Sequence, residues 1–208
     1  NFLVFFQSNG RKLPNFNLIF WFVLYQDKMN RKKKIKHLII KNKIPTCAGK
    51  KIMSYLETTH DVYKEAALTP DVGLCCTTNP IWELPGLKIP RIMQERNDGC
   101  GSTEQARDLT NNPKRLDVGG GGGMELLQFA YFNRQKGGVV GIDVVDEMLE
   151  ASRKNFKEAE AQNPWFKSEF VDLKKGDAMH LPVEDNSIDV AAQNCLFNIF
   201  KADDLKKA

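Results

Sequence analysis

Short apolar runs alternate with amphipathic segments through the second half of the chain. Runs with the length and composition of strands occupy Arg115–Val118, Gly137–Val144, Ser168–Leu173 and Ser187–Gln193. Two intervening segments place apolar side chains at helical spacing, Met124–Arg134 and Val145–Ala159, and Asn163-Pro164 should end the second. This alternation predicts an α/β fold with a doubly wound, mostly parallel sheet. Four strands are few for such a sheet, so we expect it to be incomplete at the C-terminus.

The segment before this regular pattern is different. Residues 53–112 are loop-rich and contain cysteine, with one short helix expected over Val62–Leu68. Four prolines between positions 70 and 90 break up anything longer. We therefore divide the chain into a leader (1–52), a loop-rich segment (53–112) and an α/β domain (113–208).

Charge separates the leader from the rest. Residues 1–52 hold twelve basic side chains and one acidic one, so the leader carries +11 and the remainder −7 of a net +4. Its best apolar run, Leu18–Tyr25, is far shorter than the roughly 20 residues of a membrane span. A tail that binds RNA or an anionic membrane is one interpretation, and an organellar transit segment is another. We favour upstream sequence translated in frame before Met53, disordered or absent from the native protein.

Composition narrows the class further. A hydrophobic content of 42% and a charged content of 27% are typical of a soluble globular protein. Five cysteines form an odd set without a credible signal peptide, which favours a reducing, cytoplasmic setting. We expect a small-molecule substrate and neither a nucleic acid nor a membrane as partner.

A glycine run follows the first strand of the regular pattern. LDVGGGGGMELL places Asp117, Gly119, Gly121 and Gly123 between a strand and a helix, where a ligand can approach the backbone. A pyrophosphate dinucleotide is one candidate ligand, but its fingerprint is G-x-G-x-x-G rather than G-x-G-x-G. GIDVV then places Asp143 where a carboxylate can accept both hydroxyls of a ribose. The next turn, GDAMHLP, holds Asp177 and Ala178.

In this order, D-V-G-x-G-x-G, G-I-D, G-D-A and LPVEDNSIDVAAQN resemble the motifs of the Rossmann-like, class I S-adenosylmethionine-dependent methyltransferases. The resemblance implies that Asp117 and the Gly119, Gly121 and Gly123 loop hold the methionine part of the donor. It implies that Asp143 binds the ribose, that Asp177 and Ala178 contact the adenine, and that Asn194 belongs to the same site. Helix or loop capping by Asp117, and turn formation by Asp143 and Asp177, are the alternatives.

The cysteines add a resemblance to one branch of these methyltransferases. DGCGST (Cys100), NCLFN (Cys195) and the adjacent pair Cys75 and Cys76 resemble arsenite methyltransferases of the branch linked to arsenosugar synthesis. That resemblance implies that Cys100 and Cys195 bind trivalent arsenic, as arsenite or a methylarsenical, with a third thiol beyond Ala208. It further implies that Cys75 or Cys76 pairs with Cys100 during turnover, and that a thiol reductant of thioredoxin or glutathione type restores the thiols.

Four alternatives stay open, two for the chain and two for its cysteines. The chain could methylate carbon or oxygen of a quinone- or sterol-like molecule, or be an inactive, truncated copy. The cysteines could also be buried and inert, or hold zinc, although adjacent cysteines fit zinc spacing poorly. Two features depart from the family pattern: RNDGCGS lacks the usual aromatic residue before GCG, and five consecutive glycines make an unusually flexible loop.

Overall fold

The computed structural model describes residues 5–6, 54–69, 84–97, 103 and 112–208. Their strands are β1 (Phe5–Phe6), β2 (Arg115–Val118), β3 (Val139–Asp143), β4 (Val171–Lys175) and β5 (Val190–Gln193). Their α-helices are α2 (Tyr55–Leu68), α3 (Arg91–Glu95), α4 (Met124–Phe132), α5 (Asp146–Gln162) and α6 (Ala202–Leu205). Two 3-10 turns, Ser168–Phe170 and Phe197–Ile199, complete the regular structure of this part of the chain.

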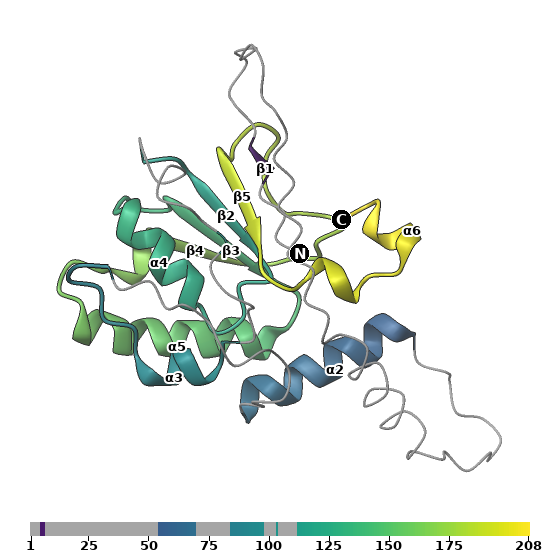
Figure 1. The fold of residues 1–208 in the computed structure, drawn as a ribbon, viewed down its shortest axis with the longest axis horizontal. Helices are drawn as coiled ribbons and strands as arrows, with labels where there is room; N and C mark the ends of the chain where they lie inside the picture. The colour runs from purple at the N-terminus through teal and green to yellow at the C-terminus, as the bar shows by residue number, and fades with distance from the viewer. Residues whose placement is uncertain (1–4, 7–53, 70–83, 98–102, 104–111) are drawn as a thin grey trace, which may run out of the picture.

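The strands form one sheet in the order β1-β5-β2-β3-β4 (Figure 1). β2, β3, β4 and β5 are parallel, whereas β1 is antiparallel to β5. The chain moves outward from β2 through β3 to β4 and then returns to place β5 on the other side of β2. This reversal is the switch point at which doubly wound sheets bind ligands, next to the carboxyl ends of the strands. The predicted Rossmann-like α/β fold is therefore confirmed.

Each face of the sheet has its own hydrophobic cluster. α4 and α5 pack on one face, where Leu126, Leu127 and Phe156 are 2% exposed or less. The other face carries Leu116 and Ile142 and is covered by the connection between β4 and β5 and by Leu196. Gly141 allows the close helix packing, because a Cβ there would lie 2.5 Å from the Leu126 side chain. The packed faces fix the strands whose carboxyl ends carry the predicted site residues.

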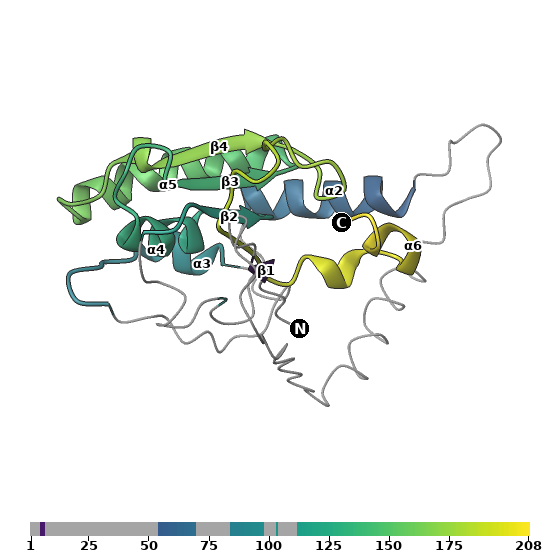
Figure 2. The same cartoon turned by 90° about the horizontal axis from the view of Figure 1, so that it is seen from above.

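Helix α2 is longer than the sequence analysis predicted. It begins at a capping box, in which Ser54 Oγ accepts from the Glu57 N–H and the Glu57 carboxylate accepts from the Ser54 N–H. Its later residues pack on α5 through Ala66 and Ala67, and Lys64 forms an ion pair with Glu147. Figure 2 shows α2 and α6 together beyond the arrowhead end of β4. The segment 53–112 thus contains a 14-residue helix where a seven-residue one was expected.

Other boundaries differ less. The predicted strand Ser168–Leu173 begins as the 3-10 turn Ser168–Phe170 and becomes extended only at Val171. The predicted strand Ser187–Gln193 starts at Val190. In the leader, Phe5 and Phe6 pair with Ala191 and Val190 of β5, a contact the sequence did not predict. Residues 7–53 lie outside the described part, so the expectations for the leader stay predictions.

Candidate methyl-donor site

The backbone conformation of the glycine loop accounts for the glycines in its sequence. The backbone φ angles of Gly119, Gly121 and Gly123 are +83°, +49° and +86°, values that residues other than glycine rarely adopt. The N–H groups of Gly119 and Gly120 donate to the Ile142 carbonyl at 2.8 and 3.1 Å, which ties the loop to β3. The alternating G-x-G-x-G pattern therefore marks the positions where the backbone needs a positive φ.

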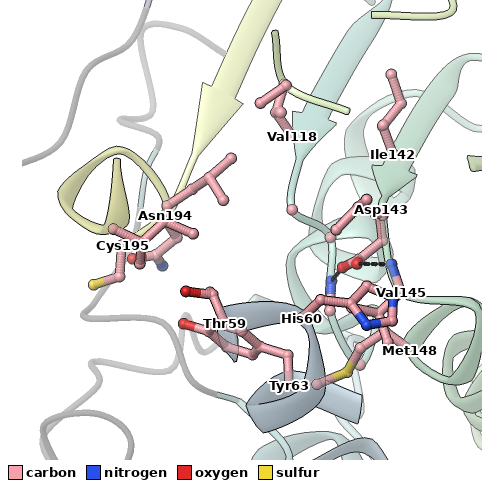
Figure 3. Close-up of a pocket in the computed structure, with 18 of the residues that line it drawn as sticks. Thr59, His60, Tyr63, Val118, Ile142, Asp143, Val145, Met148, Asn194 and Cys195 are labelled. Carbon is pink, nitrogen blue, oxygen red and sulfur yellow. Dashed lines mark hydrogen bonds between the residues drawn. The ribbon is translucent and has the colours of Figure 1, made fainter. Parts of the chain in front are cut away.

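Asp143 holds the loop from the end of β3. Its Oδ2 accepts from the Gly121 N–H at 3.0 Å, and its Oδ1 accepts from the Val145 N–H at 2.9 Å (Figure 3). Burial raises the pKa of Asp143, and the hydrogen bonds from Val145 and Gly121 oppose that rise. The carboxylate that should receive a ribose is thus already oriented by backbone donors.

Two side chains of helix α5 also hold the glycine loop by hydrogen bonds. Ser152 Oγ donates to the Gly121 carbonyl at 2.5 Å, and Asn155 Nδ2 donates to the Gly122 carbonyl at 2.9 Å. Both side chains are buried. The loop is thereby fixed by side chains of the next helix as well as by Asp143.

Asp177 lies in a tight turn after β4. Its Oδ1 accepts from the Met179 N–H at 2.9 Å, and its carbonyl accepts from the His180 N–H at 2.9 Å. This is the turn chemistry considered as an alternative. Asp177 and Ala178 nevertheless line the same cavity as the glycine loop, so the turn and the predicted position coexist.

The end of β5 has an unusual backbone. Cys195 has φ +58°, in the left-handed region, where a residue with a Cβ is strained by about 1–2 kcal/mol. Gln193 holds the turn, because its Oε1 accepts from the N–H groups of Leu196 and Phe197 at 2.8 and 3.2 Å. Cys195 is disulfide-bonded. The remaining cysteines, and hence its partner, lie outside the described residues.

These segments enclose one cavity. Asn194 and Cys195 lie on the side opposite Asp143, and α2 supplies a further wall with Thr59, His60 and Tyr63 (Figure 3). His60 lies before the helix predicted over Val62–Leu68, but the structure places it within α2, where it lines the cavity. The capping box Ser54–Glu57 was a readable sign that the helix starts early enough to include it.

The comparisons with known proteins agree with this site. Residues 116–208 match the family model described as a methyltransferase domain. Over 101 residues the chain is 31% identical to the arsenite methyltransferase of Halobacterium salinarum, covering 49% of this chain and 24% of that protein. The crystal structure of CrArsM, an arsenic(III) S-adenosylmethionine methyltransferase from Chlamydomonas reinhardtii, matches with a TM-score of 0.50 at 24% identity. That match covers 57% of this chain and 40% of that one. The chain resembles the S-adenosylmethionine-dependent methyltransferases.

The similarity covers only part of each of these proteins. The chain spans about a quarter of the length of the curated arsenite methyltransferase and 40% of the algal structure. The match to the algal protein supports the fold. None of the described helices has the length and apolarity to cross a bilayer.

The cavity brings together most of the predicted methyl-donor residues. It is lined by Gly119, Gly121, Asp143, Asp177, Ala178, Asn194 and Cys195. Asp117 is 1% exposed and, like Gly123, is not among the lining residues. Gly123 instead caps α4, and a Cβ there would lie 2.8 Å from the Phe156 ring. Cys75, Cys76 and Cys100 lie outside the described residues.

The residues that line the cavity fit S-adenosylmethionine. Consecutive glycines, Gly119 to Gly122, leave the wall without side chains, so a ligand can approach the backbone closely. Asp143 offers a carboxylate at the end of β3, and Ile142, Ala178 and Leu196 offer apolar surface for a ring. Within the described residues no group of three or more His, Cys, Asp and Glu side chains could hold a metal ion.

Glu125 was not among the predicted site residues. This carboxyl is 8% exposed, lines the methyl-donor cavity and accepts from Thr103 Oγ1 at 2.9 Å. Burial raises its pKa to about 7, although hydrogen bonds from Thr103 and Asn194 oppose the rise. An acidic residue two positions after the glycine run, in the first turn of a mostly apolar helix, was the available signal.

Proposed function

We propose that this chain carries the donor-binding part of an S-adenosylmethionine-dependent methyltransferase that acts on thiolate-bound trivalent arsenic. The observation that carries the proposal is the arrangement at one cavity of Asp143, the glycine loop and Cys195. The similarity to the arsenite methyltransferase of Halobacterium salinarum supports the choice of acceptor.

The chain's own residues would position the donor. When bound, S-adenosylmethionine supplies an electrophilic methyl group on a sulfonium. Asp143 would accept hydrogen bonds from the ribose, while the backbone at Gly119 to Gly122 would face the methionine part. Asp177 and Ala178 would lie beside the adenine, and α2 would exclude water with Thr59, His60 and Tyr63.

The acceptor chemistry suits cysteine. Trivalent arsenic is soft and prefers thiolate ligands, and it retains a lone pair that can attack a methyl carbon. That nucleophile carries no proton, so the transfer itself needs no general base. The protein's contribution is to hold arsenic near the methyl group, for which Cys195 lies on the cavity wall and Cys100 is the second proposed ligand.

Cys195 must first be released from its disulfide. Two thiols of a reductant, from two glutathione-type molecules or one thioredoxin-type dithiol, would supply two electrons and two protons, giving two protein thiols and one disulfide in the oxidised reductant. We include a thioredoxin- or glutathione-type reductant in the proposal, with Cys75 or Cys76 as the exchange partner. Such a reductant is typical of the cytoplasm, where we place the reaction.

The test is methyl transfer by the reduced full chain, supplied with arsenite and S-adenosylmethionine. We expect a methylarsenical, and we expect Cys195→Ser and Cys100→Ser to abolish it while donor binding persists. Absence of any methylarsenical from chain that binds the donor would overturn the arsenic assignment. Methylation of a quinone or sterol that survives both substitutions would support the alternative acceptor.

A further inference from the structure

Glu125 connects two parts of the chain that are far apart in sequence. At the start of α4, its carboxylate receives the hydroxyl and the backbone N–H of Thr103 and the side-chain amide of Asn194. Thr103 and Asn194 are separated by ninety residues, and the Glu125 side chain is where they meet. All three donors converge on a group that is 8% exposed.

Each of these partners is next to a cysteine in the sequence. Asn194 directly precedes Cys195, and Thr103 follows Cys100 by three residues. Three residues span about 10 Å at most, so fixing Thr103 limits how far the chain at Cys100 can extend from Glu125. Glu125 is thus linked to both cysteines that the proposed function assigns to the acceptor, by hydrogen bonds to Thr103 and Asn194 and a short stretch of chain from each.

The turn at Cys195 needs such support. Its left-handed φ of +58° is strained for a residue with a Cβ, so neighbouring hydrogen bonds must hold it. Gln193 fixes the residues after Cys195 through the Leu196 and Phe197 N–H groups. Asn194, the residue before Cys195, is held by its hydrogen bond to Glu125. The cysteine therefore stands between two anchored neighbours.

We propose that Glu125 is a positioning residue that holds Cys195 and the chain at Thr103 in one fixed arrangement beside the methyl-donor cavity. It acts through Asn194 and Thr103 rather than by touching the reacting atoms. The assignment of Cys195 and Cys100 to arsenic rests on the proposed function; the connection made by Glu125 does not.

The test measures the redox equilibrium of the Cys195 disulfide in the full chain. The protein is equilibrated with mixtures of reduced and oxidised glutathione, and the reduced fraction is read by alkylation and mass spectrometry. Two glutathione thiols convert the disulfide into two protein thiols and one glutathione disulfide. Glu125→Gln and Thr103→Val should each make the disulfide about tenfold easier to reduce, a shift of about 30 mV for this two-electron couple.

Matched variants separate positioning from general damage. Thr103→Ser keeps the hydroxyl donor, and Glu158→Gln neutralises an exposed carboxylate on α5; both should stay within about twofold of the unaltered chain. Binding of S-adenosylhomocysteine reports that each variant is folded. If Glu125→Gln fails to bind it, the comparison of Thr103→Val with Thr103→Ser decides. Equilibria within twofold for both test variants would overturn the proposal, as would loss of folding in both.

A second readout separates this proposal from the proposed function. Phenylarsine oxide, which bridges two nearby thiols, is titrated into the reduced chain. We expect binding that weakens about tenfold in Glu125→Gln and Thr103→Val. If the unaltered chain does not bind phenylarsine oxide while the redox shift is present, the arsenic assignment fails and the role of Glu125 stands.

Discussion

Oδ2 of Asp143 lies 3.0 Å from the backbone nitrogen of Gly121, so the residue proposed to bind the ribose also fixes the glycine loop. One side chain therefore links two parts of the donor site. Removing its charge should weaken both the loop and the direct contact with the donor.

Asp143→Asn should raise the dissociation constant for S-adenosylmethionine by about 10- to 100-fold. Hydrogen bonds to a charged group contribute about 1.5–3 kcal/mol, and an amide gives up one acceptor oxygen. Isothermal titration calorimetry measures the change. Asp146→Asn is the control, because Asp146 lies three residues later and pairs with Lys175 on the exposed surface. An affinity within twofold of the unaltered chain would count against the assignment of Asp143.

Gly123→Ala should destabilise the fold by about 2–4 kcal/mol. Its φ of +86° costs a side chain about 1–2 kcal/mol, and the Cβ would lie 2.8 Å from the Phe156 ring, which adds an overpacking cost. Gly137→Ala is the control, because φ is +65° but no heavy atom lies within 4 Å. Urea unfolding of both variants should show a loss at Gly123 clearly above the loss at Gly137. Equal losses would mean that the Phe156 contact relaxes at no cost.

Glu125 should make stability depend on pH. Its pKa is raised from the usual 4.5 to about 7 by burial, so the folded state binds a proton more strongly than the unfolded state. The stabilisation is fully present below about pH 4.5 and is lost as pH rises through about 7, a change of about 3 kcal/mol.

Urea unfolding at pH 5 and pH 8 measures this change in the free energy of unfolding. Glu125→Gln carries no titrating group at this position. The stability of the variant relative to the unaltered chain should therefore be higher at pH 8 than at pH 5. A constant difference across that interval would show that the carboxyl ionises in the folded protein without penalty.

The sequence predicted the sheet better than it predicted helix α2, which packs on α5. Arg115–Val118 is the strand that was predicted, because a short apolar run ending at glycines has few other solutions. Helix α2 was underestimated, since its buried residues Ala66 and Ala67 find their partners on α5, about eighty residues later. Local pattern alone does not reveal such a contact.

The sequence located those site residues whose positions depend on where the strands end. Asp143 ends β3 and Cys195 follows β5, the two strands on either side of β2, so the sheet topology brings both residues to one cavity. Asp117 is 1% exposed and does not line the cavity, so its contact with the methionine part stays a prediction. Glu125 was missed because its importance depends on burial and on partners at positions 103 and 194, which only the folded chain brings together.

The most direct test of the account is arsenic K-edge X-ray absorption of the reduced full chain loaded with arsenite in the presence of S-adenosylhomocysteine. The account predicts sulfur atoms in the first coordination shell of arsenic, and fewer of them in Cys195→Ser. A shell of oxygen atoms, or a sulfur shell unchanged by Cys195→Ser, would contradict it.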